Sequence, residues 1–126
     1  MARRFEYAVT ETAGSPAHAE ADWTPEHLLL AGLARCTLAS LEFHAKRTDV
    51  SVAGTATAQG VVTKRDQDGR YAFVKVECTL DVTLEPAPQD EGVEDLIDLA
   101  ERDCFIGASL TAPPNYSWRV NGEALR

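Results

Sequence analysis

The stretch WTPEHLLLAGLARCTLASL, residues 23–41, decides the fold because it carries the start signals of a helix and then a long apolar run. Thr24 is a suitable N-cap, Pro25 fits the first helical position, and Glu26 lies against the positive end of the helix dipole. The apolar side chains that follow cover more than the single face of an ordinary amphipathic helix. We therefore expect a central helix beginning at Pro25, which also packs on a partner.

Alternation of apolar and polar residues predicts strands on both sides of this helix. Residues 3–11 form the first strand, and a weaker alternation indicates a short second strand over residues 17–22. After the helix, residues 50–64 and 71–84 show the pattern of two long strands joined by a turn that contains Asp-Gly. Asp-Gly between alternating runs is a strong hairpin signal, so these two strands are expected to form a long hairpin.

The last third of the chain predicts one more helix and one more strand. An acidic helix is expected from about residue 91, with apolar residues at helical spacing that place Cys104 on its inward face near its end. Two prolines end this region, and residues 116–120 alternate as a final strand. The predicted order is β-β-α-β-β-α-β, an α+β fold, and a length of 126 residues predicts a single domain over residues 1–126.

Composition limits the kinds of function. The net charge of −8 argues against nucleic acid as a partner, because affinity for phosphate backbones depends on Lys and Arg. Apolar runs stay short of the roughly 20 residues that a membrane span needs, and the amino terminus lacks the apolar segment of a signal peptide. We therefore expect a cytoplasmic protein with no nucleic-acid or membrane partner.

The three cysteines are the candidates for chemistry. Their odd number and the lack of a CxxC pair fit neither a secreted disulfide framework nor a zinc site. Cys78 shares the apolar face of its predicted strand and is expected in the core. Cys36 and Cys104 each lie on the inward face of a predicted helix, so helix packing could bring them together as an attacking and a resolving thiol. Because free cysteine is commonly a buried packing residue, inert core thiols remain the alternative.

A reactive Cys36 needs a neighbouring cation or hydrogen-bond donor to become a thiolate. Arg35 is adjacent in sequence but lies about 100° around the helix, so it points elsewhere. Glu26 precedes Cys36 by ten positions, roughly 15 Å along a straight helix, which excludes direct contact within that helix. Taken alone, Glu26 is interpreted as a first-turn acid that stabilises the helix. The spacing of the histidines and cysteines does not predict a metal site.

Residues 24–29, TPEHLL, and residues 31–36, AGLARC, together resemble the NPEELL…AA…AC segment of the OsmC/Ohr family. This family comprises osmotically inducible and organic-hydroperoxide-resistance proteins. Residues 100–104, which end in a second cysteine, and the predicted order of elements extend the resemblance over nearly the whole chain. The resemblance implies an intertwined homodimer with buried central helices, and active sites near the subunit interface. It also implies thiol-dependent reduction of organic hydroperoxides without a metal, haem or other cofactor.

By this resemblance Cys36 corresponds to the peroxidatic cysteine, Cys104 to the resolving cysteine, and Glu26 to the glutamate that holds the family's catalytic arginine. The implied mechanism ends in a Cys36–Cys104 disulfide that an external dithiol reduces, and a lipoyl-type dithiol is the family expectation. The apolar pocket expected around Cys36 favours apolar peroxides.

The chain departs from the family pattern in two places. The family's arginine precedes the first helix, whereas residues 12–24 contain no arginine and only His18 as a possible cation. Phe105 follows Cys104, where the family commonly has proline. Arg3, Arg4 or Arg35 are the other candidates for the missing cation. The alternative function is therefore an OsmC-fold protein that binds a small molecule or acts in stress, with little peroxidase activity.

Overall fold

The computed structural model describes residues 2–15 and 19–126 of the chain. Its elements follow the order β1 (Phe5–Thr12), α1 (Pro25–Lys46), β2 (Ser51–Lys64), β3 (Tyr71–Glu85), α2 (Asp90–Arg102), α3 (Phe105–Ala108), β4 (Asn115–Val120) and β5 (Glu123–Ala124). The predicted α+β class is confirmed, and the long hairpin lies where the alternation and the Asp-Gly turn indicate it.

One predicted strand is wrong, and two short elements were not expected. Residues 19–22 form a loop that ends in a turn instead of a strand, and residues 17–18 of that prediction lie outside the described residues. The alternation there is weak and spans only a few residues, and this segment joins no strand of the sheet. Helix α3 and strand β5 are too short to produce a periodic pattern in the sequence.

Helix α1 begins as its cap residues predict. The Thr24 hydroxyl accepts a hydrogen bond from the His27 N–H at 3.3 Å, and the Thr24 N–H donates to His27 Nδ1 at 3.0 Å. The side chain of each residue thus accepts a hydrogen bond from the backbone N–H of the other, which forms a capping box. Pro25 occupies the first helical position, where a backbone N–H would have no partner within the helix. The ring of Trp23 stacks on that of His27, with centroids 6.0 Å apart, which fixes the direction from which the chain enters the helix.

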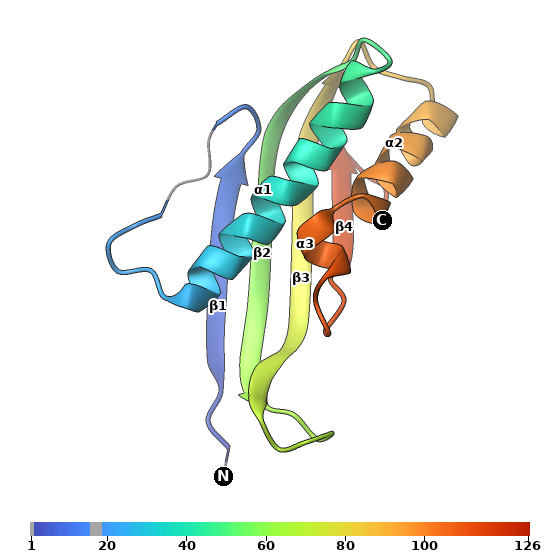
Figure 1. Ribbon diagram of the computed structural model, residues 1–126. Coiled ribbons are helices and arrows are strands. Elements are labelled where there is room, and N and C mark those ends of the chain that lie inside the picture. The colour runs from blue at the N-terminus through green and yellow to red at the C-terminus, as the bar shows by residue number, and fades with distance from the viewer. Residues whose placement is uncertain (1, 16–18) are drawn as a thin grey trace.

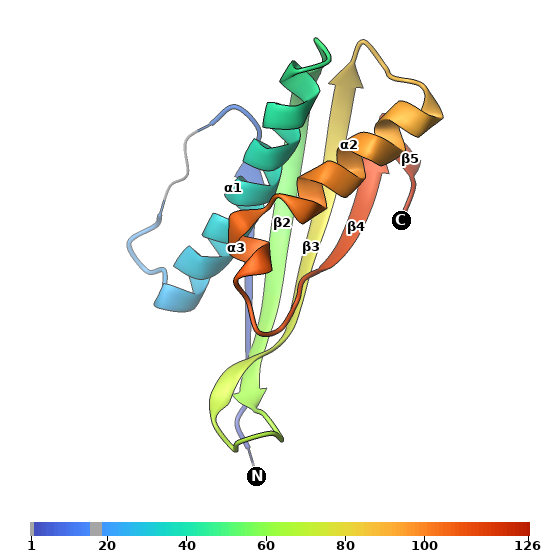
Figure 2. The ribbon, with the colours of Figure 1, turned by 45° about the vertical axis from the view of Figure 1, so that its right-hand side comes forward.

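The strands form one sheet in the order β1-β2-β3-β4-β5, and the helices lie on one face of it (Figures 1 and 2). All neighbouring strands are antiparallel except β3 and β4, which are parallel. The crossover between these two strands contains α2 and α3, because a parallel pair cannot be joined by a tight turn. The core lies between the sheet and the helices, where small Ala56 and Ala58 on β2 allow α1 to approach closely.

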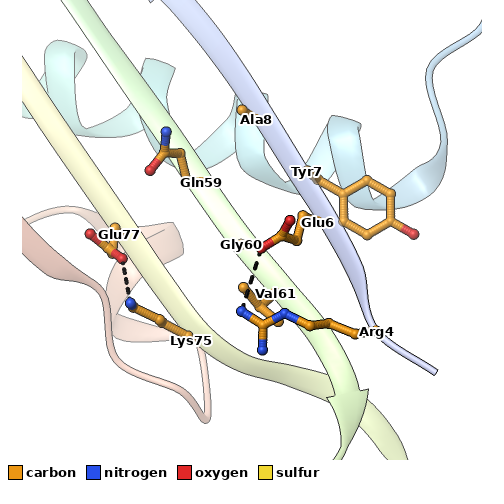
Figure 3. Close-up of a pocket in the computed structure, with 9 residues that line it drawn as sticks. All are labelled: Arg4, Glu6, Tyr7, Ala8, Gln59, Gly60, Val61, Lys75 and Glu77. Atoms are coloured by element: carbon orange, nitrogen blue, oxygen red, sulfur yellow. Dashed lines mark hydrogen bonds and ion pairs between the residues drawn. The ribbon is translucent and has the colours of Figure 1, made fainter. Parts of the chain in front are cut away.

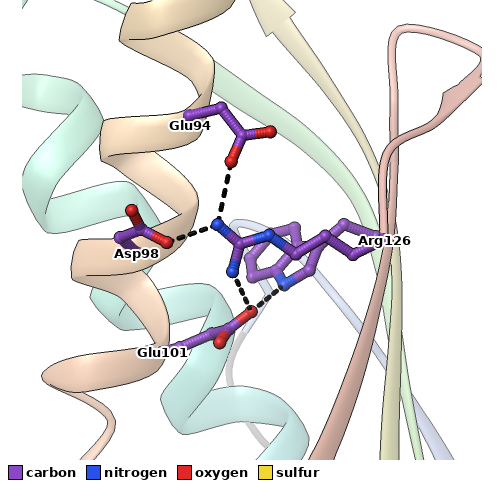
Figure 4. Close-up of polar contacts among 5 residues, drawn as sticks. Glu94, Asp98, Glu101 and Arg126 are labelled. Atoms are coloured by element: carbon purple, nitrogen blue, oxygen red, sulfur yellow. Dashed lines mark hydrogen bonds and ion pairs between the residues drawn. The ribbon is translucent and has the colours of Figure 1, made fainter.

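Helix α2 is fastened to the strands beneath it by polar contacts. The indole N–H of Trp118 on β4 donates to Glu101 at 2.7 Å. The guanidinium of Arg126 binds Glu94 at 2.9 Å and Glu101 at 3.3 Å, and also binds Asp98 (Figure 4). These contacts hold the carboxyl end of α2, and therefore the start of the segment that carries Cys104.

Helix α1 is long and apolar enough, by length and composition alone, to cross a membrane. This corrects the expectation that the apolar runs of the sequence are too short for a membrane span. Half of that stretch is buried inside the fold, where it forms the centre of the core. The core therefore accounts for one side of the helix. The exposed side bears Leu28 and Phe43, which are 51% and 61% exposed.

Candidate functional site

Cys104 does not lie on the second helix, as its spacing predicted, but at the joint after it. Helix α2 ends at Arg102, and Cys104 is the N-cap of α3, where its sulfur accepts a hydrogen bond from the Gly107 N–H at 3.4 Å. The helix ends here because the Asp103 carboxylate is held by His44 of α1 at 2.7 Å and by Arg102 at 2.9 Å. Cys104 is nevertheless fully buried and points into the molecule.

Cys36 lies beside the segment that carries Cys104, because Phe105 lines the same cavity as Cys36, and Cys104 is near enough to affect the pKa of Cys36. Burial raises the pKa of the half-buried Cys36, and the neighbouring Cys104 adds to this rise. The backbone N–H groups of Ile106 and Phe105, at the start of α3, act in the opposite direction, because nearby donors favour the charged thiolate. The short helix after Cys104 therefore supplies the donors that the sequence left unidentified, although burial has the larger effect.

Thr37 links Cys104 to the third cysteine. Its hydroxyl donates to the Leu33 carbonyl at 2.9 Å, so its oxygen is left to accept from the Cys104 thiol at 3.3 Å. The Cys78 sulfur lies 4.0 Å from the same oxygen. Cys78 is fully buried, and burial raises its pKa to about 12. The structure thus places Cys78 in the core, as the alternation of β3 predicts.

Gly107 is needed where α3 passes over β4. A Cβ at this position would lie 2.6 Å from the hydroxyl of Tyr116 and 3.5 Å from the sulfur of Cys104. The absence of a side chain lets the Tyr116 hydroxyl sit beside Cys104, and burial there raises the pKa of Tyr116. Cys104 is therefore enclosed by Thr37, Gly107 and Tyr116.

Cys36 lines a cavity of about 460 Å³ on the outer side of α1. The cavity follows the helix, because its α1 residues are spaced by one and two turns. Its walls are mainly apolar, and Phe43 and Phe105 at its rim are 61% and 78% exposed. The lining residues are Cys36, Ala39, Ser40, Phe43, His44, Asp103 and Phe105.

Besides Cys36, the polar side chains that line this cavity are those of Ser40, His44 and Asp103. His44 and Asp103 bind each other at 2.7 Å, two helical turns beyond Cys36. Ser40 lies between Cys36 and His44 along α1, is 9% exposed, and its hydroxyl makes no hydrogen bond to any residue that the structure describes. The sequence placed Ser40 on the same helical stripe as Cys36, and that spacing was the one signal that pointed to it.

The structure does not bring Glu26 to Cys36. Glu26 lies in the first turn of the unbroken helix α1, and within residues 2–15 and 19–126 it makes no hydrogen bond or ion pair. Arg35 is mostly buried, with its side chain 17% exposed. It donates to the carbonyl of Thr12 at 2.7 Å, to the carbonyl of Ser15, and to Glu42 at 2.8 Å. Arg35 thus fastens the loop after β1 and faces away from Cys36.

The other candidate cations also lie elsewhere. Arg3 stacks on Phe5, 4.8 Å from the ring centroid. Arg4 binds Glu6 at 3.4 Å beside a hollow of about 350 Å³ on the sheet face turned away from the helices (Figure 3). This hollow contains charged pairs but no cysteine. His18 lies outside the described residues. Among those described, no three His, Cys, Asp or Glu side chains gather to hold a metal ion.

Comparisons with known proteins agree on the fold. The chain is similar to the solved structure of an OsmC-like hydroperoxide resistance protein from Jannaschia sp. CCS1, with a TM-score of 0.64, 17% identity and 97% of each chain covered. An OsmC-like protein from Mycoplasma pneumoniae has a TM-score of 0.61 and 16% identity, with 94% of this chain and 96% of that chain covered.

An OsmC-like protein of unknown function from Vibrio cholerae has a TM-score of 0.61 and 21% identity, with 76% of this chain covered. The present chain spans 62% of the length of that protein. No curated protein sequence matches the chain. A family model described as OsmC-like protein matches residues 17–119, which include both α1 and the segment of Cys104. The chain therefore belongs to the family of OsmC-like proteins.

Proposed function

We propose that the protein is a thiol peroxidase that reduces organic hydroperoxides through Cys36, with Cys104 as the resolving cysteine. The observation that carries the proposal is the position of Cys36, whose sulfur adjoins Cys104 on one side and an apolar cavity on the other. The name of the Jannaschia relative, an OsmC-like hydroperoxide resistance protein, supports the same reaction class.

The proposed reaction begins with attack of the Cys36 thiolate on the terminal oxygen of the hydroperoxide. The sulfur–oxygen bond forms, the oxygen–oxygen bond breaks, and the alcohol leaves after taking up one proton. Cys104 then attacks the resulting sulfenic acid, which releases water and forms the Cys36–Cys104 disulfide. An external dithiol of the lipoyl type reduces this disulfide by exchange. Since such dithiols persist in reducing compartments, a cytoplasmic location is part of the proposal.

The active form in this proposal is an intertwined homodimer. The rim of the Cys36 cavity exposes Phe43 and Phe105, and the outer side of α1 is apolar. A second copy of the chain packed against this side would bury these rings and close the cavity against water. Glu26, which is too far from Cys36 in its own chain, would then hold a cation at the site of the other subunit.

The test mixes reduced protein with a small excess of cumene hydroperoxide, counts free thiols and maps disulfides by mass spectrometry. The expected result is rapid loss of two thiols as a Cys36–Cys104 disulfide. The Cys104→Ser variant should stop at a sulfenic acid, and the Cys36→Ser variant should not react. Survival of both thiols in the wild-type protein would contradict the proposal.

A second candidate function is the binding of a small apolar molecule with little peroxidase activity. The raised pKa of Cys36 favours it, because less thiolate is then present at neutral pH. The cavity itself serves either function. Native mass spectrometry of the purified protein distinguishes the two functions. A binding protein should retain a ligand, and the Phe43→Asp variant should lose it. The thiols of such a protein should resist peroxide.

A further inference from the structure

We propose that Ser40 is a catalytic residue whose hydroxyl donates a hydrogen bond to the leaving oxygen of the peroxide. The inference rests on the proposed peroxidase function and assigns a second group to the same site. It begins from the position of Ser40, one helical turn after Cys36. Residues four apart on a helix lie on one face, with Cβ atoms about 5–6 Å from each other, and both residues line the cavity.

The hydroxyl of Ser40 is unusual for a buried serine in a helix. Such hydroxyls ordinarily donate to the carbonyl one turn earlier, as Thr37 does to Leu33 at 2.9 Å. Ser40 is 9% exposed, yet its oxygen has no hydrogen-bond partner among the residues described. A buried hydroxyl without a partner costs free energy. Its presence at the cavity wall therefore indicates that an atom of a bound ligand accepts its hydrogen bond.

The reaction supplies such an atom. When the Cys36 sulfur bonds to the terminal oxygen and the oxygen–oxygen bond breaks, the electron pair of that bond stays on the leaving oxygen. A donor aimed at this oxygen stabilises the developing charge most where water is excluded. The alkoxide then takes up a proton, which balances the proton that the Cys36 thiol released. The products are the sulfenic acid and the alcohol.

The other side chains that line the cavity do not offer an equivalent donor near Cys36. Ala39, Phe43 and Phe105 contribute apolar side chains. His44 binds Asp103 at 2.7 Å and lies roughly 12 Å beyond Cys36 along the helix axis. Ser40 is therefore the described side chain that combines nearness to Cys36 with an unengaged hydroxyl.

The test compares two reactions of the same thiolate. Single-turnover oxidation by cumene hydroperoxide expels an oxygen, whereas alkylation by iodoacetamide expels iodide and has no use for an oxyanion donor. We expect Ser40→Ala to slow the oxidation on the order of 10²-fold, as for loss of other oxyanion donors, and to leave the alkylation rate unchanged. Ser40→Thr, which keeps the hydroxyl, should restore most of the oxidation rate. Ser51→Ala, at an exposed position on β2, serves as the matched control for loss of a hydroxyl.

The outcomes separate this inference from the function on which it rests. If wild-type protein is not oxidised at all, the peroxidase proposal and the role of Ser40 both fail. If wild-type and Ser40→Ala are oxidised equally fast, the role of Ser40 alone fails. If Ser40→Ala slows oxidation and alkylation by the same factor, Ser40 acts on the sulfur or on the packing, and its assignment to the leaving oxygen is wrong.

Discussion

Cys36 and Cys78 are both neighbours of Cys104, and their surroundings differ in access and in donors. Cys36 is half-buried, opens to a cavity, and faces two backbone N–H groups of α3. Cys78 is fully buried in the core, and its sulfur lies 4.0 Å from the Thr37 oxygen. Burial raises the pKa of both thiols. The comparison teaches that the two thiols differ in access and in nearby donors and not in nearness to Cys104, and under the proposed function this difference separates the reactive thiol from the inert one.

The largest expected effect comes from removing one or the other thiol. Cys36→Ser should lower the rate of peroxide-driven thiol loss on the order of 10³-fold or more, because the nucleophile is lost. Cys78→Ala should leave that rate unchanged and lower the free energy of unfolding by about 1 kcal/mol, through a small cavity. Thiol titration after a peroxide pulse and urea unfolding measure the two quantities. Slow peroxide-driven loss of thiols in Cys78→Ala would contradict the assignment of different roles to Cys36 and Cys78.

Alkaline pH should lower the free energy of unfolding through the buried thiol of Cys78. The folded pKa of Cys78 is about 12, whereas an unfolded cysteine titrates near 8.5, so only the unfolded chain loses this proton at pH 10. Stability contributed by the protonated thiol is therefore lost as the pH rises above about 8.5, by about 2 kcal/mol at pH 10. Urea unfolding of wild-type and Cys78→Ala under reducing conditions measures it. Since the wild type is the more stable protein by about 1 kcal/mol at pH 7, the two stability profiles should cross near pH 9, and parallel profiles would contradict the burial argument.

Glu26→Gln tests whether a second subunit modifies the environment of Cys36. If Glu26 holds a cation at that site, its loss lets the effect of burial dominate, the Cys36 pKa rises, and less thiolate is present at neutral pH. Alkylation of Cys36 by iodoacetamide at pH 7 should then slow by about tenfold, the effect of one pKa unit. Cys78 should be unaffected. An unchanged rate would leave Glu26 as a first-turn acid, and Glu91→Gln on α2 is the control for loss of a surface charge near a helix start.

The smallest effect is expected for Thr37→Val, which removes the shared oxygen but keeps the shape of the side chain. Cys104 loses the acceptor of its thiol at 3.3 Å, so its position beside Cys36 is less fixed. We expect formation of the disulfide to slow by about fivefold, the equivalent of one hydrogen bond, while the first oxidation of Cys36 keeps its rate. Trapping of the sulfenic acid with dimedone separates the two steps. Equal slowing of both would mean that Thr37 acts on Cys36 instead.

Local signals were sufficient for most of the fold. The cap at Thr24, the first-position Pro25 and the Asp-Gly turn of the hairpin each act within a few residues, and the structure has the elements where these signals predict them. The alternation of β3 likewise predicts the inward position of Cys78. Such features depend on backbone preferences and periodicity, which a sequence displays directly.

Features that depend on distant segments could not be predicted. The spacing of α2 continues to Cys104, but the helix ends earlier because His44, from another helix, binds Asp103. The sequence predicts only that Arg35 points away from Cys36, and could not predict that the carbonyls of Thr12 and Ser15 hold it. The unpartnered hydroxyl of Ser40 is likewise a result of packing, since its sequence context is that of an ordinary helical serine.

The contact between Trp118 and Glu101 gives this molecule its own optical reporter. The indole is 2% exposed and donates to a carboxylate three residues before Cys104. Any shift of the carboxyl end of α2 as the disulfide forms would change the polarity around this ring, and with it the wavelength and intensity of its emission. The other tryptophan, Trp23, lies beside His27 at the amino end of α1, far along the helix from Cys36. Emission from Trp118 could therefore follow each turnover without a label, with Trp23 as the reference.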